Sequence, residues 1–282
     1  MNYFKYLASL LLFGSNGVIA SYIDLTSYEI VFLRSAFGTA FLIAIFFISK
    51  RRLTVRQNPK DAVFIALSGI AMGVEWMLLF EAYAQLGVSL GVIINYSGPA
   101  IVIAFSVLFL KEKITSAKLI SLIAAFTGVL LISGQTAETA GSLRGLCCAV
   151  LSAFTYAAMV ILNRKATKIT GLENATLQLF FALITIGSFV FFKQGFYMEI
   201  AAGDLLPVLW LGLINTGVGC YLYFSTIGKL PVQTVAICGY LEPLSAAVLS
   251  ALILHEALTP LQLVGVALII GGAIFSECYK NP

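Results

Sequence analysis

The chain has 282 residues, of which 60% are hydrophobic and 11% are charged, and its mean hydropathy is +0.98. A water-soluble domain carries roughly 25% charged residues, so this composition excludes a protein covered mainly by water. Lipid allows only helices or closed barrels to cross it. The apolar runs are unbroken, without the alternation of barrel strands, and have the length of a spanning helix, about 20 residues.

These apolar runs predict an all-α membrane protein with ten transmembrane helices. In chain order they cover residues 6–23, 29–49, 62–84, 89–110, 117–134, 143–163, 174–192, 205–226, 233–254 and 261–278. The first run lacks a small-residue cleavage site, so we expect a retained helix and not a signal peptide. Most connections are short, which makes consecutive helices antiparallel neighbours.

The positions of Lys and Arg predict the orientation, because such residues gather on the cytoplasmic side. With a cytoplasmic N-terminus, the outer side holds only Arg144 and Lys193, and Arg34 lies inside a span. The cytoplasmic side then holds Lys5, Lys50, Arg51, Arg52, Arg56, Lys60, Lys111, Lys113, Lys118, Arg164, Lys165, Lys168, Lys229 and Lys280. We therefore expect a multi-pass protein of the inner, or plasma, membrane with both termini in the cytoplasm. The net charge of +4 reflects this orientation and does not indicate nucleic-acid binding.

The two halves of the chain resemble each other at a shift of 144 residues. The shift pairs Glu29 with Glu173, Gly73 with Gly217, Phe80 with Phe224, Leu86 with Leu230, Tyr96 with Tyr240, Pro99 with Pro243, Leu110 with Leu254, Glu112 with Glu256, Thr115 with Thr259 and Gly128 with Gly272. Each half, 1–136 and 137–282, holds five predicted spans. Because five is odd, the halves enter the membrane in opposite senses. Inverted repeats of this kind are typical of secondary transporters.

Two segments carry a family resemblance. One runs from Asn95-Tyr-Ser-Gly-Pro99 through Leu110-Lys-Glu112 to Gly128, and the other from Tyr240-Leu-Glu-Pro243 through Leu254-His-Glu256 to Gly272. They resemble the two EamA repeats of the drug/metabolite transporter superfamily, and Arg34 in the second span fits the same pattern. The resemblance covers nearly the whole chain. It implies ten helices, a central cavity and export or import of small organic solutes, which in this superfamily include amino acids, nucleotide-linked compounds, amines and vitamins.

Pro99 and Pro243 lie near the middle of the fourth and ninth predicted spans. Each proline removes a backbone hydrogen bond and frees a carbonyl about one turn earlier. We expect a kink at both sites, where alternating access could bend the helix; a static packing kink is the alternative. Thr259, with Gln262 three residues later, predicts the capped start of the last helix, and Thr115 occupies the matching place in the first half.

Four charged residues are predicted inside spans, where each would cost about 2.5 kcal/mol or more if it faced lipid at mid-depth. Arg34 and Glu81 both fall in the outer third, which predicts a structural ion pair between them. Glu75 and Glu242 fall near mid-depth, one in each half, with no Lys or Arg expected at that level. Burial and mutual repulsion favour the protonated form of such carboxyls, so both are candidates for substrate binding and proton coupling. The alternative is a protonated, hydrogen-bonded carboxyl that only packs.

Other polar and aromatic side chains at that depth are candidates to line a substrate cavity. Aromatic faces beside carboxylates suit ammonium groups through cation–π attraction. Trp76 is the foremost of them, because it adjoins Glu75 and is far from the interface where Trp usually lies. The others are Asn16, Tyr96, Tyr156, Asn215, Tyr221 and Tyr240.

These features predict a transporter of a small, polar, amine-bearing metabolite that works by exchange or proton coupling. An exporter of neutral or zwitterionic solutes such as amino acids, with structural carboxylates, remains an alternative. A channel or a membrane enzyme is a different class; His255 is the only histidine, and the chain has no catalytic or metal motif. We expect no cofactor, and we expect a monomer whose small residues, among them Ala124, Gly128 and Gly272, pack the halves into a pseudo-dimer. A homodimer is compatible with the sequence but not required.

Overall fold

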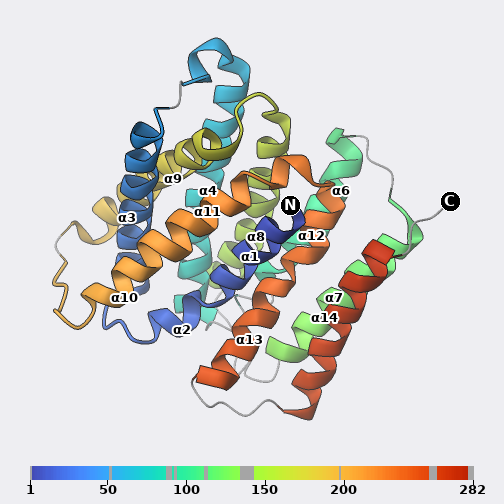
Figure 1. Cartoon of the computed structure of the whole chain (residues 1–282). Helices are drawn as coiled ribbons and strands as arrows, with labels where there is room; N and C mark the ends of the chain where they lie inside the picture. Colours follow the sequence, from blue (N-terminus) through green and yellow to red (C-terminus); the bar gives the residue numbers. More distant parts are fainter. Residues whose placement is uncertain are drawn as a thin grey trace.

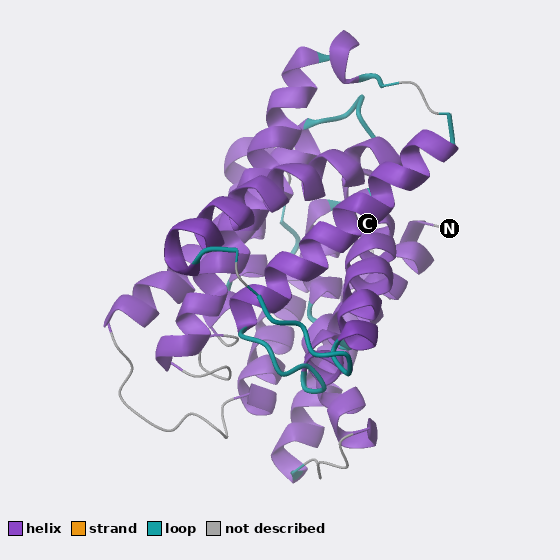
Figure 2. Ribbon diagram, turned by 90° about the vertical axis from the view of Figure 1, so that its left-hand side faces the viewer, coloured by secondary structure: helices purple, strands orange, loops and turns teal. Residues whose placement is uncertain are grey.

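The computed structural model describes residues 2–50, 53–86, 91, 94–110, 114–133, 143–196, 198–253 and 259–278. Over this part of the chain the protein consists of helices and loops without a strand (Figure 2). The helices of the first half are α1 (Asn2–Gly14), α2 (Asn16–Ala20), α3 (Ser27–Ile48), η1 (Val55–Gln57), α4 (Pro59–Leu86), α6 (Gly98–Leu110) and α7 (Ser116–Ser133). Those of the second half are α8 (Leu143–Lys165), α9 (Gly171–Gln194), α10 (Leu205–Trp210), η3 (Leu211–Val218), α11 (Gly219–Phe224), η4 (Ile227–Lys229), α12 (Val232–Gly239), α13 (Leu241–Ile253) and α14 (Pro260–Cys278).

Six helical stretches among the described residues are long and apolar enough to cross a membrane. They are Ser27–Ile48, Pro59–Leu86, Leu143–Lys165, Gly171–Gln194, Leu205–Lys229 and Val232–Ile253. Shorter apolar helical stretches cover Gly98–Val107, Ser116–Leu131 and Pro260–Gly272. The protein is therefore a multi-pass, all-helical membrane protein, as its composition predicts.

The predicted helix starts are confirmed where polar side chains cap the first turn. The Thr259 backbone N–H donates to Gln262 Oε1 (2.9 Å), and the Gln262 N–H donates to Thr259 Oγ1 (3.3 Å). At the matching place of the first half, Thr115 Oγ1 accepts from the Lys118 N–H (3.4 Å). These bonds satisfy backbone donors that a helix start leaves without an intrahelical partner.

Several apolar stretches are interrupted rather than continuous. A turn at Tyr96 and Ser97 precedes α6. The turn residue Tyr240 separates the end of α12 at Gly239 from the start of α13 at Leu241. Pro99 and Pro243 are the second and third residues of the new helices, where the missing N–H leaves no bond unmade. The predicted mid-helix kinks are thus breaks that lie two to three residues before each proline. The first predicted span, 6–23, also breaks, between α1 and α2. The eighth predicted span, 205–226, contains the π-helical stretch η3.

The helices pack in a few dominant pairs. Helix α4 lies against both α8 and α9, α3 lies against α9 and η3, and α1 lies against α11 and α13. Helix α6 contacts α8 and α12. Helices α7 and α14 run side by side at one edge of the bundle (Figure 1). Close approach there depends on glycine, because a Cβ at Gly128 would lie 2.6 Å from the Gly265 carbonyl oxygen and one at Gly272 would lie 3.0 Å from that of Ser121.

Candidate functional site

Glu75 is a buried carboxylate of α4, with 5% of its surface exposed. Its Oε1 accepts a hydrogen bond from Asn95 Nδ2 at 3.2 Å, and the same amide donates to Ser152 Oγ at 3.0 Å. Asn95 stands directly before the turn at Tyr96 and Ser97, so the broken helix of the first half holds the carboxylate against α8. Asn95 was not among the predicted site residues, although an amide beside Tyr96 in an apolar run was a signal for it.

Arg34 supplies a fixed positive charge in the middle of this group. Its guanidinium carbon lies 4.3 Å from the centroid of the Trp76 ring, within cation–π distance. Its Nε is buried and has no hydrogen-bond partner. The Trp76 face that the sequence suggested for a substrate ammonium therefore already holds a protein cation.

Glu242 is the second residue of α13, and its side chain is partly accessible. The carboxyl groups of Glu242 and Glu75 interact electrostatically with each other, and both interact with Arg34. Neither forms a direct ion pair with it. The expectation that no basic residue lies at this level is wrong, because the long Arg34 side chain reaches inward from α3. Within the described part of the chain, these two carboxylates thus share one fixed cation.

The predicted ion pair between Arg34 and Glu81 is also wrong. Glu81 Oε1 lies 3.1 Å from Arg144, and Oε2 pairs with Lys193 and accepts from the Tyr28 hydroxyl. The reason is the packing of α4. Its Glu81 side meets α8 and α9, which bring Arg144 and Lys193, whereas α3 contacts α4 only slightly.

Tyr96 and Tyr240 come together from the two halves. The Tyr240 hydroxyl donates to the Tyr96 carbonyl oxygen at 3.0 Å, and the ring centroids are 6.1 Å apart. Tyr240 is fully buried, so its role is to join the two helix breaks. Tyr156 packs beside Gly98 at the start of α6. Tyr221 is partly accessible on α11.

Asn16 and Asn215 also meet. Asn215 Nδ2 donates to Asn16 Oδ1 (2.9 Å) and to the Leu12 carbonyl oxygen (2.8 Å), and Asn215 is fully buried. This amide in η3 thereby satisfies backbone and side-chain groups at the break between α1 and α2. Both predicted lining residues stabilise a helix interruption in this conformation.

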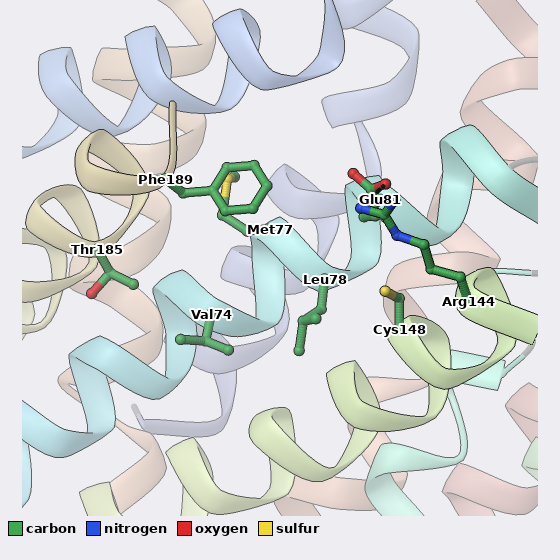
Figure 3. A pocket seen from close by; sticks show the side chains of 8 residues that line it. All are labelled: Val74, Met77, Leu78, Glu81, Arg144, Cys148, Thr185 and Phe189. Atoms are coloured by element: carbon green, nitrogen blue, oxygen red, sulfur yellow. Dashed lines mark ion pairs between the residues drawn. The ribbon is translucent and has the colours of Figure 1, made fainter. Parts of the chain in front are cut away.

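Two cavities lie away from this central group. One, of about 230 Å³, lies on α4, α8 and α9 and includes Glu81 and Arg144 (Figure 3). The other, of about 510 Å³, includes Asp24, Glu29 and Glu199. Neither is lined by Glu75 or Glu242. Outside the described residues lie Glu112, just beyond the fourth predicted span, and His255 and Glu256, just beyond the ninth.

Comparisons with known proteins agree with this architecture. The model of the EamA-like transporter family matches residues 2–134 and again residues 143–277. The uncharacterized transporter YxxF of Bacillus subtilis (strain 168) is 26% identical over 95% of this chain and 86% of its own length. Protein PecM of Dickeya dadantii (strain 3937) is 26% identical over 75% of this chain and 72% of its own.

A solved crystal structure shares the fold, with a TM-score of 0.82 over 98% of both chains at 16% identity. The six long apolar helices, the helix breaks that meet at the bundle centre and the family match over both halves agree with one another. The chain belongs to the EamA-like transporter family.

Proposed function

We propose that the protein is a secondary active transporter that moves a small, polar, amine-bearing metabolite across the inner membrane by alternating access coupled to protons. The observation that carries the proposal is the central charge group, in which Glu75 and Glu242 share one cation of the described residues, Arg34. With both carboxyls ionised, the group carries one uncompensated negative charge. An uncompensated charge inside a membrane protein is costly and marks a functional pathway, so a proton or a substrate ammonium group supplies the missing positive charge.

The proposed architecture is ten transmembrane helices in two inverted repeats, 1–136 and 137–282. The helix contacts support it, because a shift of 144 residues relates α4 to η3 and α11, α1 to α8, and α6 to α13. The contact between α4 and α8 then corresponds to the contact between α11 and α1. The contact between α4 and α9 corresponds to that between η3 and α3, and the contact between α6 and α8 corresponds to that between α13 and α1. Tyr96 and Tyr240, 144 residues apart, contact each other, as expected near an axis relating two halves. The double match of the family model adds further support.

Hydrogen bonds tie α4 to the second half at both ends. At the start of α4, Asp61 Oδ2 accepts from the Lys168 N–H (2.6 Å), and nearby the Glu173 carboxylate accepts from the backbone N–H (2.7 Å) and hydroxyl (2.6 Å) of Thr54. At the other end, Glu81 holds α8 and α9. We therefore assign α3, α4, α8 and α9 to a fixed scaffold. The broken helices, α1–α2, the segment 94–110 and α12–α13, are the parts that change between inward- and outward-open states.

The distribution of basic residues supports an inner-membrane location with both termini in the cytoplasm. The single chain contains both repeats, so one copy suffices for a central pathway, and a homodimer is not required. The transported solute passes between the two repeats at the level of Glu75 and Glu242.

One observation favours the second candidate, a carrier of zwitterionic solutes such as amino acids. Arg34 Nε is buried without a partner, and a guanidinium group is suited to a carboxylate. In that case Arg34 binds the solute and the two glutamates have a structural role.

The experiment that tests the proposal is a flux screen in proteoliposomes, with radiolabelled amines and amino acids, run with and without a pH gradient. We expect saturable counterflow of an amine, driven by the gradient. Either Glu242→Gln or Glu75→Gln abolishes the coupling while the purified variant stays folded. Asp24→Asn, an exposed carboxylate outside the central group, serves as the matched control. Normal transport by both glutamine variants at every pH would show that the carboxylate mechanism is wrong, and unsaturable flux would indicate a pore.

A further inference from the structure

The cavity on α4 has an apolar end and a charged end. Val74, Leu78 and Glu81 follow one another on a single face of α4 and form its floor. Arg144 and Cys148 of α8 line one side, and Thr185 and Phe189 of α9 line the other (Figure 3). From Val74 to Glu81 the floor rises about 10 Å, at about 1.5 Å per residue. It is apolar along this length and charged at one end.

The charged end carries a net positive charge. Among the described residues, Glu81 is the one carboxylate that pairs there, and it pairs with both Arg144 and Lys193, which leaves one positive charge in excess within this group. The Arg144 side chain is 71% exposed, so most of its donors point to the surroundings and not to Glu81. The site can accept an anion without breaking the existing pairs.

The two ends of the cavity lie at different depths in the membrane, and each suits its surroundings. Arg144 is the second residue of α8, and Lys193 is the last residue but one of α9. Both helices are candidate spans, so the charged end lies at the membrane–water interface and the apolar floor runs into the hydrocarbon. Leu151 and Ile184, on the flanking helices, are 51% and 50% exposed. The helix surfaces beside the cavity therefore face lipid, and neither Glu75 nor Glu242 lines the cavity.

We propose that this cavity binds an anionic phospholipid of the adjoining leaflet, with the phosphate on Arg144 and Lys193 and one acyl chain along Val74 and Leu78. Basic residues next to a spanning helix attract anionic headgroups, and the apolar floor excludes a free phosphate ion as the natural occupant. The inference depends on the membrane location and not on the transported solute. Because the same residues join α4, α8 and α9, the lipid would stabilise that contact.

The test is lipid-dependent thermal unfolding of the full-length protein in detergent. The protein is titrated in parallel with phosphatidylglycerol, with phosphatidylcholine that has the same acyl chains, and with water-soluble glycerol phosphate. A ligand of the folded state raises the unfolding midpoint, so we expect a larger shift with phosphatidylglycerol than with either of the others. Arg144→Ala weakens phosphatidylglycerol binding about fivefold, the effect of one basic residue near the surface. Leu78→Trp, which fills the cavity, removes the difference between the lipids.

Lys60→Ala is the matched control, because Lys60 is an exposed basic residue at the opposite end of α4; it keeps the wild-type shifts. Equal shifts with the two lipids, a wild-type response of Arg144→Ala, or an equal effect of glycerol phosphate would each overturn the proposal. If Leu78→Trp does not fold, Arg144→Ala, a change at an exposed side chain, decides alone.

Discussion

Arg34 is the residue on which the charge balance of the bundle centre depends. It interacts electrostatically with Glu75 and Glu242 while its guanidinium lies on Trp76. Removing a buried cation leaves carboxylates without compensation. We therefore predict that Arg34→Gln lowers the thermal stability of the purified protein more than Arg34→Gln combined with Glu75→Gln. The coupling between the two sites should be about 1 kcal/mol, typical of residues in one network.

The measurement is a double-mutant cycle by thermal unfolding in one detergent. A matched cycle pairs Arg34→Gln with Asp24→Asn, whose carboxylate is exposed and lies outside the group, and should be additive. If the stability losses of Arg34→Gln and Glu75→Gln are additive as well, Arg34 does not balance the charge of Glu75.

The sequence singles out two carboxylates in apolar runs but does not give their partners. Glu75 and Glu242 stand out because an acid in an apolar run is expensive. Arg34 was assigned to Glu81 because depth was read from position along each span. Depth alone does not say which helix faces which. The contacts of α4 with α8 and α9 decide the partner of Glu81, and they depend on tertiary packing.

At the scale of the element, the break between α12 and α13 is joined to the break before α6 by one hydrogen bond. Tyr240 donates it to the Tyr96 carbonyl. Tyr240→Phe should lower stability by about 0.6 kcal/mol, the average worth of a side-chain hydrogen bond inside a membrane protein. Tyr221→Phe is the control, because that hydroxyl makes no such contact. Equal effects of the two variants in thermal unfolding would contradict a specific role for the bond.

The connection between α3 and α4 is held by Glu173 from the start of α9. Its carboxylate accepts hydrogen bonds from Thr54 and from the Val55 N–H, and it is 6% exposed. Hydrogen bonds to a charged group contribute about 1.5–3 kcal/mol, so Glu173→Ala should cost roughly 2 kcal/mol in a thermal unfolding assay.

The counterpart of Glu173 in the first half, Glu29, bonds to Thr26 in the cap of its own helix. Glu29→Ala should therefore cost less, about 1 kcal/mol, the usual value for a lost cap. A larger loss at Glu29 than at Glu173 would remove the case for a scaffold tied across the halves at this end.

At the scale of the whole molecule, the sequence predicted helix positions better than helix continuity. Apolar runs define spans because lipid demands them, and the caps at Thr115 and Thr259 appear where polar residues require them. The break at Tyr240 was misplaced onto Pro243. A proline lacks the N–H and its ring clashes with the carbonyl four residues earlier, so the helix restarts with the proline in its first turn and the interruption falls upstream. The π-helical stretch η3 has no local sequence signal, because Asn215 and its tertiary partners stabilise it.

The proposed orientation places the two ends of α4 on opposite sides of the membrane. We predict that a cysteine at Arg144, next to Glu81, reacts with a membrane-impermeant maleimide in intact cells. A cysteine at Lys60, at the start of α4, should react only after permeabilisation. Both changes are made in a chain whose native cysteines are replaced, since Cys147 is exposed. The reverse labelling pattern would invert the topology, and equal labelling from outside would contradict a spanning α4.

A cross-link between α7 and α14 tests which parts of the protein move during transport. A Cβ at Gly272 would lie 3.5 Å from the Ala124 Cβ, within the range for a disulfide, about 3.5–4.5 Å. We predict that Ala124→Cys with Gly272→Cys cross-links under oxidation and retains transport, because the proposed motion resides in the broken helices and not between α7 and α14. Gly271→Cys, at a site with no atom within 4 Å, should not cross-link to Ala124→Cys. If the oxidised protein loses flux and a reductant restores it, α7 and α14 must separate during the cycle, and the halves then move as two bodies.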